Sequence, residues 1–180
     1  MVQIDFGELN VSVGSYSIQG RRLSMEDEHV VLHHPHFNFT TQTKDGVSRS
    51  YFAVFDGHGG NECARYAANN VHGALAKSTH FQKECTTLAE RKEALELAFK
   101  EAFARVDEDF LESKAAATSS GSTGVVCLIE DNLVCIANVG DSRAVLCQGR
   151  FASQMSFDHK PNRRDERERI LGKSSILFLC

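Results

Sequence analysis

The sequence predicts an α+β domain in which strands come first, two adjacent helices follow, and further strands come after them. Three observations support this prediction. Residues 49–55 form a run that is apolar on both faces, which is typical of a buried strand. Residues 61–77 and 88–112 carry apolar side chains at helical spacing, and short apolar runs after residue 122 alternate with turn-forming pairs. Because no strand separates the two helices, the order differs from the alternating strand–helix units of a parallel sheet.

The composition is that of a single globular domain. Of the 180 residues, 42% are hydrophobic and 24% are charged, so the chain can bury a core of its own. A net charge of −4 argues against a protein that binds nucleic-acid backbones. No apolar run reaches the roughly 20 residues of a membrane helix, and the first residues lack the features of a secretion signal. We therefore expect an intracellular, cytoplasmic protein, with the nucleus as the alternative. By default it is a monomer that binds neither membrane nor nucleic acid.

Two further strands are predicted ahead of residue 49. Residues 11–18 alternate in polarity, which indicates a strand that bends at Gly14, and residues 28–33 form the second strand. The polar stretch Pro35–Ser48 between these strands and the buried one is predicted to be a hairpin-like loop.

Helix signals follow the buried strand. The second predicted helix opens on Thr87-Leu88-Ala89-Glu90, which has the spacing of a capping box. Apolar residues from Leu95 to Phe110 then recur at helical intervals, so one face of a helix that ends near Glu112 is apolar.

The last part of the chain predicts two hairpins and a short helix. Asp131-Asn132 and Gly149-Arg150 are the predicted turns of the hairpins. Pro161 is predicted to open a charged helix that ends at Ile170, since proline is favoured in a first helical turn.

The cysteines are predicted to be structural. Cys127, Cys135 and Cys147 lie within apolar runs, where cysteine usually acts as a small buried hydrophobe. No C-x-x-C pair occurs, which excludes a zinc ribbon and a thioredoxin-type redox motif.

The strongest signal for chemistry is Asp56-Gly57-His58-Gly59-Gly60, directly after the predicted buried strand. A carboxylate there suits a hard divalent cation such as Mg²⁺ or Mn²⁺, which prefer oxygen ligands. Gly57 lets the backbone approach closely enough for its carbonyl to join the ligands, and His58 can give a proton to a departing alkoxide. The alternative is a glycine-rich turn in which Asp56 only caps the next helix, and this motif alone supports both interpretations.

Two more polar clusters point the same way. Arg21-Arg22-Leu23-Ser24-Met25-Glu26-Asp27 combines guanidinium groups that suit a phosphate with carboxylates that suit a hydrated metal ion. Taken alone, this segment is equally explained as a solvated charged loop. The third cluster, Asn138–Arg143, puts Asp141 at the end of a predicted strand, although a type I turn accounts for Gly140-Asp141-Ser142 equally well.

In their order along the chain, these motifs resemble those of the metal-dependent protein phosphatase family, type 2C. The resemblance spans about residues 11–170 and rests on segments that match the family's ordered motifs. These are Gly20-Arg21-Arg22-x-x-Met25-Glu26-Asp27, Phe52–Gly60, Ser120-Gly121-Ser122-Thr123, Ala137–Leu146, Asp158-His159-Lys160-Pro161 and Glu168-Arg169-Ile170.

The resemblance implies a layered α-β-β-α sandwich of antiparallel sheets flanked by helices. It also implies a binuclear Mn²⁺ or Mg²⁺ centre, with a looser third ion, that hydrolyses phosphoserine and phosphothreonine in phosphoprotein substrates through a metal-activated water. Asp56 would bridge two ions and Gly57 would bind one through its carbonyl. Glu26 and Asp27 would hold metal-bound waters, and Asp141 would help to bind the third ion.

The resemblance assigns two further residues to the reaction itself. Arg22 would bind the phosphate and His58 would act as general acid. Because a water molecule attacks, no cysteine or serine nucleophile is required.

The resemblance ends at Glu168-Arg169-Ile170. We expect residues 1–170 to be the N-terminal part of a type 2C catalytic domain, and residues 171–180 to be a tail that departs from the family pattern. The later family segments supply two more metal-binding aspartates and further strands, and no Asp or Glu follows Glu168 here. The sequence thus predicts a C-terminally truncated phosphatase that binds metal weakly and has little or no activity.

Two other function classes remain open at this point. One is a non-catalytic fragment that competes for the partners of a full-length phosphatase, which would bind a partner without metal-dependent turnover. The other is a different dinuclear phosphoesterase, which shares the Asp-x-His pattern. That class needs an Asn-His pair of metal ligands, and the sequence contains no Asn-His dipeptide.

Overall fold

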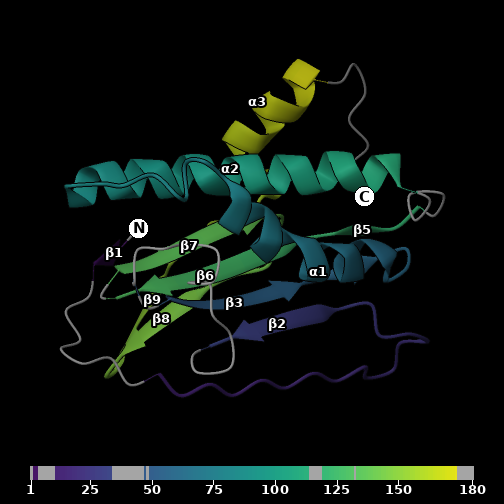
Figure 1. Ribbon diagram of the computed structural model, residues 1–180. Coiled ribbons are helices and arrows are strands. Elements are labelled where there is room, and N and C mark those ends of the chain that lie inside the picture. Colours follow the sequence, from purple (N-terminus) through teal and green to yellow (C-terminus); the bar gives the residue numbers. More distant parts are fainter. Residues whose placement is uncertain are drawn as a thin grey trace.

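The fold was analysed in a computed structural model, which describes residues 2–3, 11–33, 47, 49–113, 119–131 and 133–173. The elements follow one another in nearly the predicted order (Figure 1). They are β1 (Val2–Gln3), β2 (Glu28–Leu32), β3 (Arg49–Phe55), β4 (Gly57–His58), α1 (Glu62–Lys77), α2 (Leu88–Glu112), β5 (Gly121–Ser122), β6 (Gly124–Glu130), β7 (Leu133–Val139), β8 (Val145–Gln148), β9 (Phe151–Gln154) and α3 (Arg164–Lys173).

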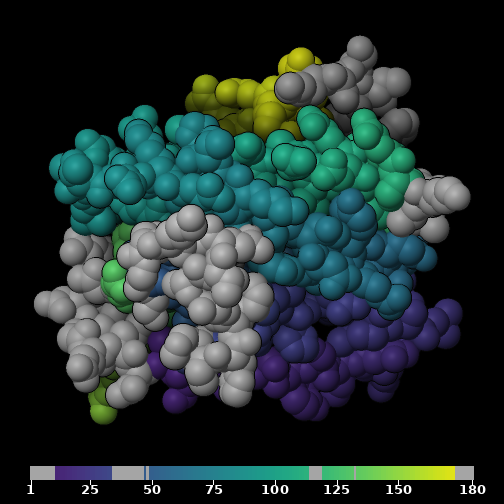
Figure 2. All heavy atoms as spheres, in the orientation of Figure 1, coloured from purple at the N-terminus to yellow at the C-terminus, as the bar shows by residue number. Residues whose placement is uncertain are grey.

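The strands form antiparallel sheets. Five of them make one sheet in the order β1-β7-β6-β3-β2, while β4 pairs with β5 and β8 pairs with β9. Helices α1 and α2 cover one face of the large sheet (Figure 1), and their blue and teal surfaces fill the middle and upper parts of the space-filling view (Figure 2). The predicted α+β class, with antiparallel sheets flanked by helices, is confirmed.

The core lies between the two helices and the inner face of the sheet. Alternate residues of β3, Tyr51, Ala53 and Phe55, are at most 4% exposed because successive strand side chains point to opposite faces. They pack in one cluster with Leu75 of α1 and Leu95 of α2, both fully buried. Burial of this apolar surface is the main source of stability for the sheet–helix pair.

The outer face of β3 is less covered than the sequence predicts. Phe52 is half-buried and Val54 is 48% exposed, so the expectation of a strand buried on both faces is wrong. The reason is that the described helices pack on one side only. The other side faces an open cavity of about 810 Å³, which residues 11–18 line from across the gap.

Residues 11–18 form no strand, contrary to the prediction from their alternating polarity. The segment runs in extended form past β2 (Figure 1), at the lower edge of the face seen in Figure 2. Alternating polar and apolar residues show that successive side chains face different environments. A strand also needs a neighbouring strand for its backbone hydrogen bonds. Here the cavity separates the segment from the outer sheet face.

The capping box of α2 is confirmed. The amide of Glu90 donates to Thr87 Oγ1 at 3.2 Å, and the Glu90 carboxylate accepts from the Thr87 amide at 3.3 Å. Helix α1 begins at Glu62 with Asn61 as its N-cap residue. Asp56 is therefore not the helix cap, and this alternative interpretation of the glycine-rich turn is wrong.

Helix α3 begins three residues later than predicted. The amide of Arg163 donates to the Lys160 carbonyl at 2.9 Å, which closes a turn over Pro161 before the helix starts. The Arg163 guanidinium then binds the Asp165 carboxylate at 2.6 and 2.7 Å in the first helical turn. Helix α3 continues to Lys173, across the predicted domain boundary after residue 170, which itself stays a prediction.

The hairpins β6–β7 and β8–β9 are confirmed, with Asp131 at φ 49° and Gly149 at φ 61° in their turns.

The cysteines differ from one another. Cys135 is buried, and burial raises the pKa of its thiol to about 12, whereas Cys147 is exposed on β8, part of a separate two-stranded sheet. The prediction that Cys147 is buried is therefore wrong.

Parts of the predictions fall outside the described residues. These are most of the loop Pro35–Ser48 and the tail from residue 174 onward. Among the helices of the described part, none is long and apolar enough to cross a membrane.

Candidate metal centre

Asp56 is held at a break between two strand pairs. It follows β3 directly and precedes β4, while Thr123 occupies the matching position between β5 and β6. The Thr123 amide donates to the Asp56 carbonyl at 2.9 Å, and the Asp56 amide donates to Thr123 Oγ1 at 3.2 Å. The backbone of Asp56 is thus fixed on both sides by one residue, and its carboxyl group is left free for other contacts.

The carboxyl group of Asp56 lies among other acids. Partial burial raises its pKa, and so do the nearby charges of Asp27 and Asp141 and a hydrogen bond with the Asp27 carboxyl group; the charge of His58 acts in the opposite direction. Two carboxylates that interact this closely disfavour the ionised form of one another. Three of the predicted metal ligands, from three separate segments, are therefore near enough for their charges to interact, and Asp27 and Asp56 share a hydrogen bond.

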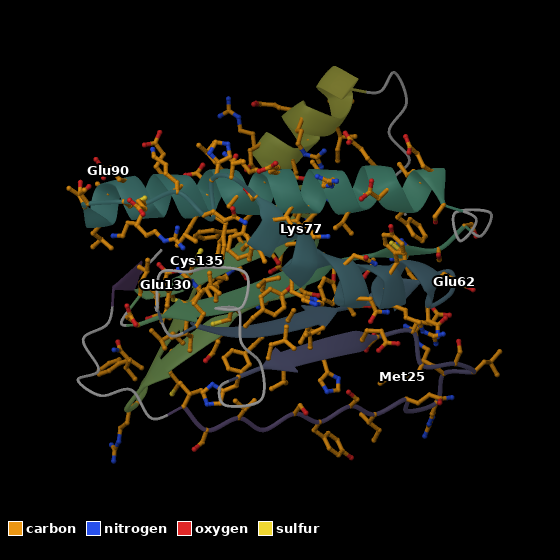
Figure 3. All side chains as sticks on the ribbon, in the orientation of Figure 1. Met25, Glu62, Lys77, Glu90, Glu130 and Cys135 are labelled. Atoms are coloured by element: carbon orange, nitrogen blue, oxygen red, sulfur yellow. The ribbon has the colours of Figure 1, made fainter. Side chains whose placement is uncertain are left out.

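The segment that carries Glu26 and Asp27 packs against the glycine turn. A Cβ atom on Gly57 would overlap the carbonyl oxygen of Glu26, so only glycine permits this approach. The Glu26 side chain accepts a hydrogen bond from the Ser24 hydroxyl at 3.0 Å. Side-chain and main-chain oxygens of residues 26, 27, 56 and 57 thus meet at the same end of the sheet. Figure 3 shows the neighbouring Met25 and Glu62 at this end, far from Glu130.

Asp141 reaches the site from the loop after β7. Gly140, at φ 91°, turns the chain, and its carbonyl accepts from the His159 amide at 2.8 Å. The Asp141 carboxylate lies 3.6 Å from the Lys160 ammonium group, which is also 3.9 Å from the Asp158 carboxylate. Lys160 therefore supplies positive charge beside this part of the acidic cluster.

His58 lies on β4 beside Gly121 of β5, its partner in the strand pair. A Cβ atom on Gly121 would overlap the His58 ring, so this glycine makes room for the imidazole. His58 is exposed and two residues from Asp56, a position from which it can exchange protons with a bound molecule.

Arg22 makes no ion pair with the carboxylates among the described residues. It lies in an exposed turn, where its carbonyl accepts from Gln19 Nε2 at 2.8 Å. Its predicted role as phosphate ligand stays a prediction.

The donor set fits a hard divalent cation. The candidate ligands around Asp56 are carboxylate and carbonyl oxygens, the ligand type that Mg²⁺ and Mn²⁺ prefer. Burial and then the repulsion between these acids raise the pKa of Asp56, and a bound cation would relieve the repulsion. Among the described residues, however, no three His, Cys, Asp or Glu side chains form a group that could hold an ion. The chemistry of the site suits a metal, while the ligand shell is unfinished.

Residues to which the sequence assigns no role also belong to this site. Thr123 and Lys160 lie in motifs that carry the resemblance, and their contacts to Asp56 and Asp141 appear only once the strands are paired. Glu62 Oε2 is buried without a hydrogen-bond partner among the described residues, at the start of α1. The helical spacing of the sequence does not single out Glu62, because many acidic residues at the surface of a helix have the same spacing.

Comparison with known sequences matches residues 11–177 to the family described as Protein phosphatase 2C. Human protein phosphatase 1F is 42% identical over 159 residues, which cover 88% of this chain and 32% of the human protein. Probable protein phosphatase 2C 55 of Oryza sativa subsp. japonica is 38% identical over 169 residues, which cover 93% of this chain and 40% of the rice protein. The chain thus spans only 32–40% of the length of these two relatives.

Solved structures agree on the fold. The structure of a C. elegans sex determining protein has a TM-score of 0.70 and 25% identity, and covers 91% of this chain and 38% of that one. The serine-threonine phosphatase 2C from Toxoplasma gondii has a TM-score of 0.66 and covers 84% of this chain and 51% of that one; at 20% identity the likeness concerns the fold alone. Because both curated relatives bear phosphatase names, the non-catalytic alternative is not favoured.

Proposed function

This chain belongs to the protein phosphatase 2C family, and we propose that its acidic cluster binds Mn²⁺ or Mg²⁺ for the hydrolysis of phosphoserine and phosphothreonine in proteins. The observation that carries the proposal is the convergence of Asp27, Asp56 and Asp141 from three segments of the chain. A structural role is a poor explanation of this convergence, because like charges held close together destabilise a fold, and of the three acids it is Asp141 that has Lys160 beside it.

The residues divide into those that hold the cation and those that handle the substrate. Asp56, with the carbonyl of Gly57, would hold the ion most directly, while Glu26, Asp27 and Asp141 would act around it. When bound, such an ion lowers the pKa of water and stabilises negative charge on a phosphoryl group.

His58 would serve the leaving group. Departure of a serine or threonine oxygen produces a strongly basic alkoxide, which needs a proton as the bond to phosphorus breaks. A protonated imidazole nitrogen of His58 can supply it from the exposed end of the site. Arg22 would bind the phosphate oxygens, for which its exposed turn must bring the guanidinium to the site.

The proposal is tested on the 180-residue chain by Mn²⁺ titration calorimetry and by phosphate release from a phosphothreonine peptide. We expect weak Mn²⁺ binding and low turnover, because the described residues form an unfinished ligand shell. Asp56→Asn should remove both. The matched control is Asp109→Asn, which neutralises an exposed carboxylate of α2 and should change neither. Mn²⁺ affinity that is equal in Asp56→Asn and the wild type would refute the proposed site.

A further inference from the structure

We propose that Thr123 is a positioning residue whose side-chain hydroxyl joins the Asp56 loop to the Asp141 loop and so sets the separation of the two carboxylates. The inference rests on the proposed function, because the separation matters for a cation that both carboxylates serve. It assigns no contact between Thr123 and the substrate.

The first part of the evidence is an altered strand pair. In a regular antiparallel pair, every second pair of opposite residues exchanges two backbone hydrogen bonds. At Asp56 and Thr123 one of these is present, from the Thr123 amide to the Asp56 carbonyl at 2.9 Å. In place of the other, the Asp56 amide donates to Thr123 Oγ1 at 3.2 Å, and the Thr123 carbonyl accepts from the Ser122 hydroxyl at 2.7 Å. The position of the Asp56 backbone therefore depends on a side-chain hydroxyl.

The second part is the contact of the same hydroxyl with the other loop. Thr123 Oγ1 lies 2.6 Å from the hydroxyl oxygen of Ser142, the residue next to Asp141. Gly140 packs against the same side chain, since a Cβ atom there would lie 2.7 Å from Thr123 Cγ2 and 2.8 Å from its Cβ. One threonine thus contacts both sides of the Asp141 loop as well as Asp56.

The topology explains why a residue at this position can do so. Strand β6 lies between β3 and β7, and the loops of Asp56 and Asp141 follow β3 and β7 at the end of the sheet where β6 begins. Thr123 directly precedes β6 and so stands between the two loops. Because the Asp56 and Asp141 carboxylates repel each other, loss of this connection should let the loops move apart.

The experiment compares Thr123→Val, which keeps the shape and loses the hydroxyl, with Thr123→Ser, which keeps the hydroxyl. Ser142→Ala and the double variant Thr123→Val/Ser142→Ala break the connection from the other side. The control is Thr79→Val, an exposed threonine just beyond α1, whose 16 residues span about 24 Å from the site end. Each chain is measured by hydrogen exchange with mass spectrometry and by Mn²⁺ titration.

We expect Thr123→Val to speed amide exchange in the segments around Asp56 and around residues 140–142, while Thr123→Ser and Thr79→Val stay within about twofold of the wild type. Thr123→Val and Ser142→Ala should each weaken Mn²⁺ binding about fivefold, the effect of one hydrogen bond. The double variant should bind no more weakly than Thr123→Val, since both changes break the same connection.

The outcomes separate this inference from the proposed function. If the wild-type chain binds no Mn²⁺, the proposed function is refuted. The role of Thr123 is still tested in that case by amide exchange around Asp56 and around residues 140–142. Exchange that changes around Asp56 but not around residues 140–142 refutes the connection. If Thr123→Val does not fold, the Ser142→Ala variant tests the proposal instead. We then expect Ser142→Ala to speed amide exchange around Asp56, and an unchanged exchange rate there would overturn the proposal.

Discussion

Arg91 binds the carboxylate of Glu130 with two parallel hydrogen bonds, from Nε and from Nη2, each 2.6 Å long. Arg49 adds a third bond to the same carboxylate at 2.7 Å, and both guanidinium groups stand 5.1 Å from the ring centroid of Phe81. The three charged side chains are at most 12% exposed. Helix α2 is thereby attached to β3 and β6 at the end of the sheet remote from the acidic cluster (Figure 3).

Glu130→Ala should destabilise the fold by about 3–5 kcal/mol, because it removes the carboxylate that offsets the charge of two buried guanidinium groups. Urea unfolding followed by circular dichroism measures the loss. Glu96→Ala removes a carboxylate of an exposed pair with Lys100 on the same helix that carries Arg91, and should change stability little. Similar losses in the two variants would contradict this account of the buried cluster.

The contribution of Glu130 should also depend on pH. Burial alone would raise the pKa of this carboxyl group, but the hydrogen bonds and charges of Arg91 and Arg49 outweigh it and hold the pKa below its ordinary value of 4.5. A lowered folded-state pKa gives stability that is present above pH 4.5 and is lost as pH falls through the folded value. The gap in unfolding free energy between wild type and Glu130→Gln should therefore be constant near neutrality and shrink below pH 4.5. If the difference in unfolding free energy between the two chains widened in acid, the pKa of Glu130 would be raised in the folded state and not lowered.

Thr87→Ala should cost about 1 kcal/mol of stability, since it removes the side-chain half of the capping box of α2. Thr87→Ser keeps the hydroxyl that accepts from the Glu90 amide, and should retain most of the stability. Thermal unfolding of the three chains checks the ranking. A serine variant as unstable as the alanine variant would show that the methyl group, and not the cap, matters.

Gly57→Ala should destabilise the chain by about 1–3 kcal/mol and weaken Mn²⁺ binding, because the new methyl group would collide with the rigid carbonyl of Glu26. Gly73→Ala is the matched control: it lies within α1 with open space around the added methyl group. That change should stabilise the chain by about 0.5–1 kcal/mol, as alanine favours a helix over glycine. Equal effects of the two substitutions on unfolding and titration would refute the close approach at Gly57.

His58→Gln should slow any Mn²⁺-dependent hydrolysis of a phosphothreonine peptide by about 10²–10⁴-fold. Hydrolysis of an aryl phosphate should fall much less, since its leaving oxygen is weakly basic and needs no proton donor. Steady-state rates on both substrates test this. Losses of equal size would assign His58 a structural role beside Gly121.

Local signals were enough to predict the helices and hairpins. The capping box at Thr87 and the apolar spacing from Leu95 to Phe110 lie within α2 itself, so their meaning needs no distant partner. The same holds for β3, whose bounds agree with the prediction. Where the outcome depended on neighbours, prediction failed. Residues 11–18 have the alternation of a strand but pair with no strand of the described part of the chain. Helix α3 starts later than predicted, where Arg163 bonds to Asp158 and Asp165.

The acidic cluster shows the same division. The sequence by itself offered Asp56, directly after an apolar strand, as a candidate ligand, and the resemblance to type 2C phosphatases extended the set to Asp27 and Asp141. Only the tertiary structure decided that the charges of Asp27 and Asp141 act on Asp56, and that Thr123 contacts both the Asp56 loop and the Asp141 loop. The physical reason is the pairing of β6 with both β3 and β7, which brings together residues more than 60 positions apart in the sequence.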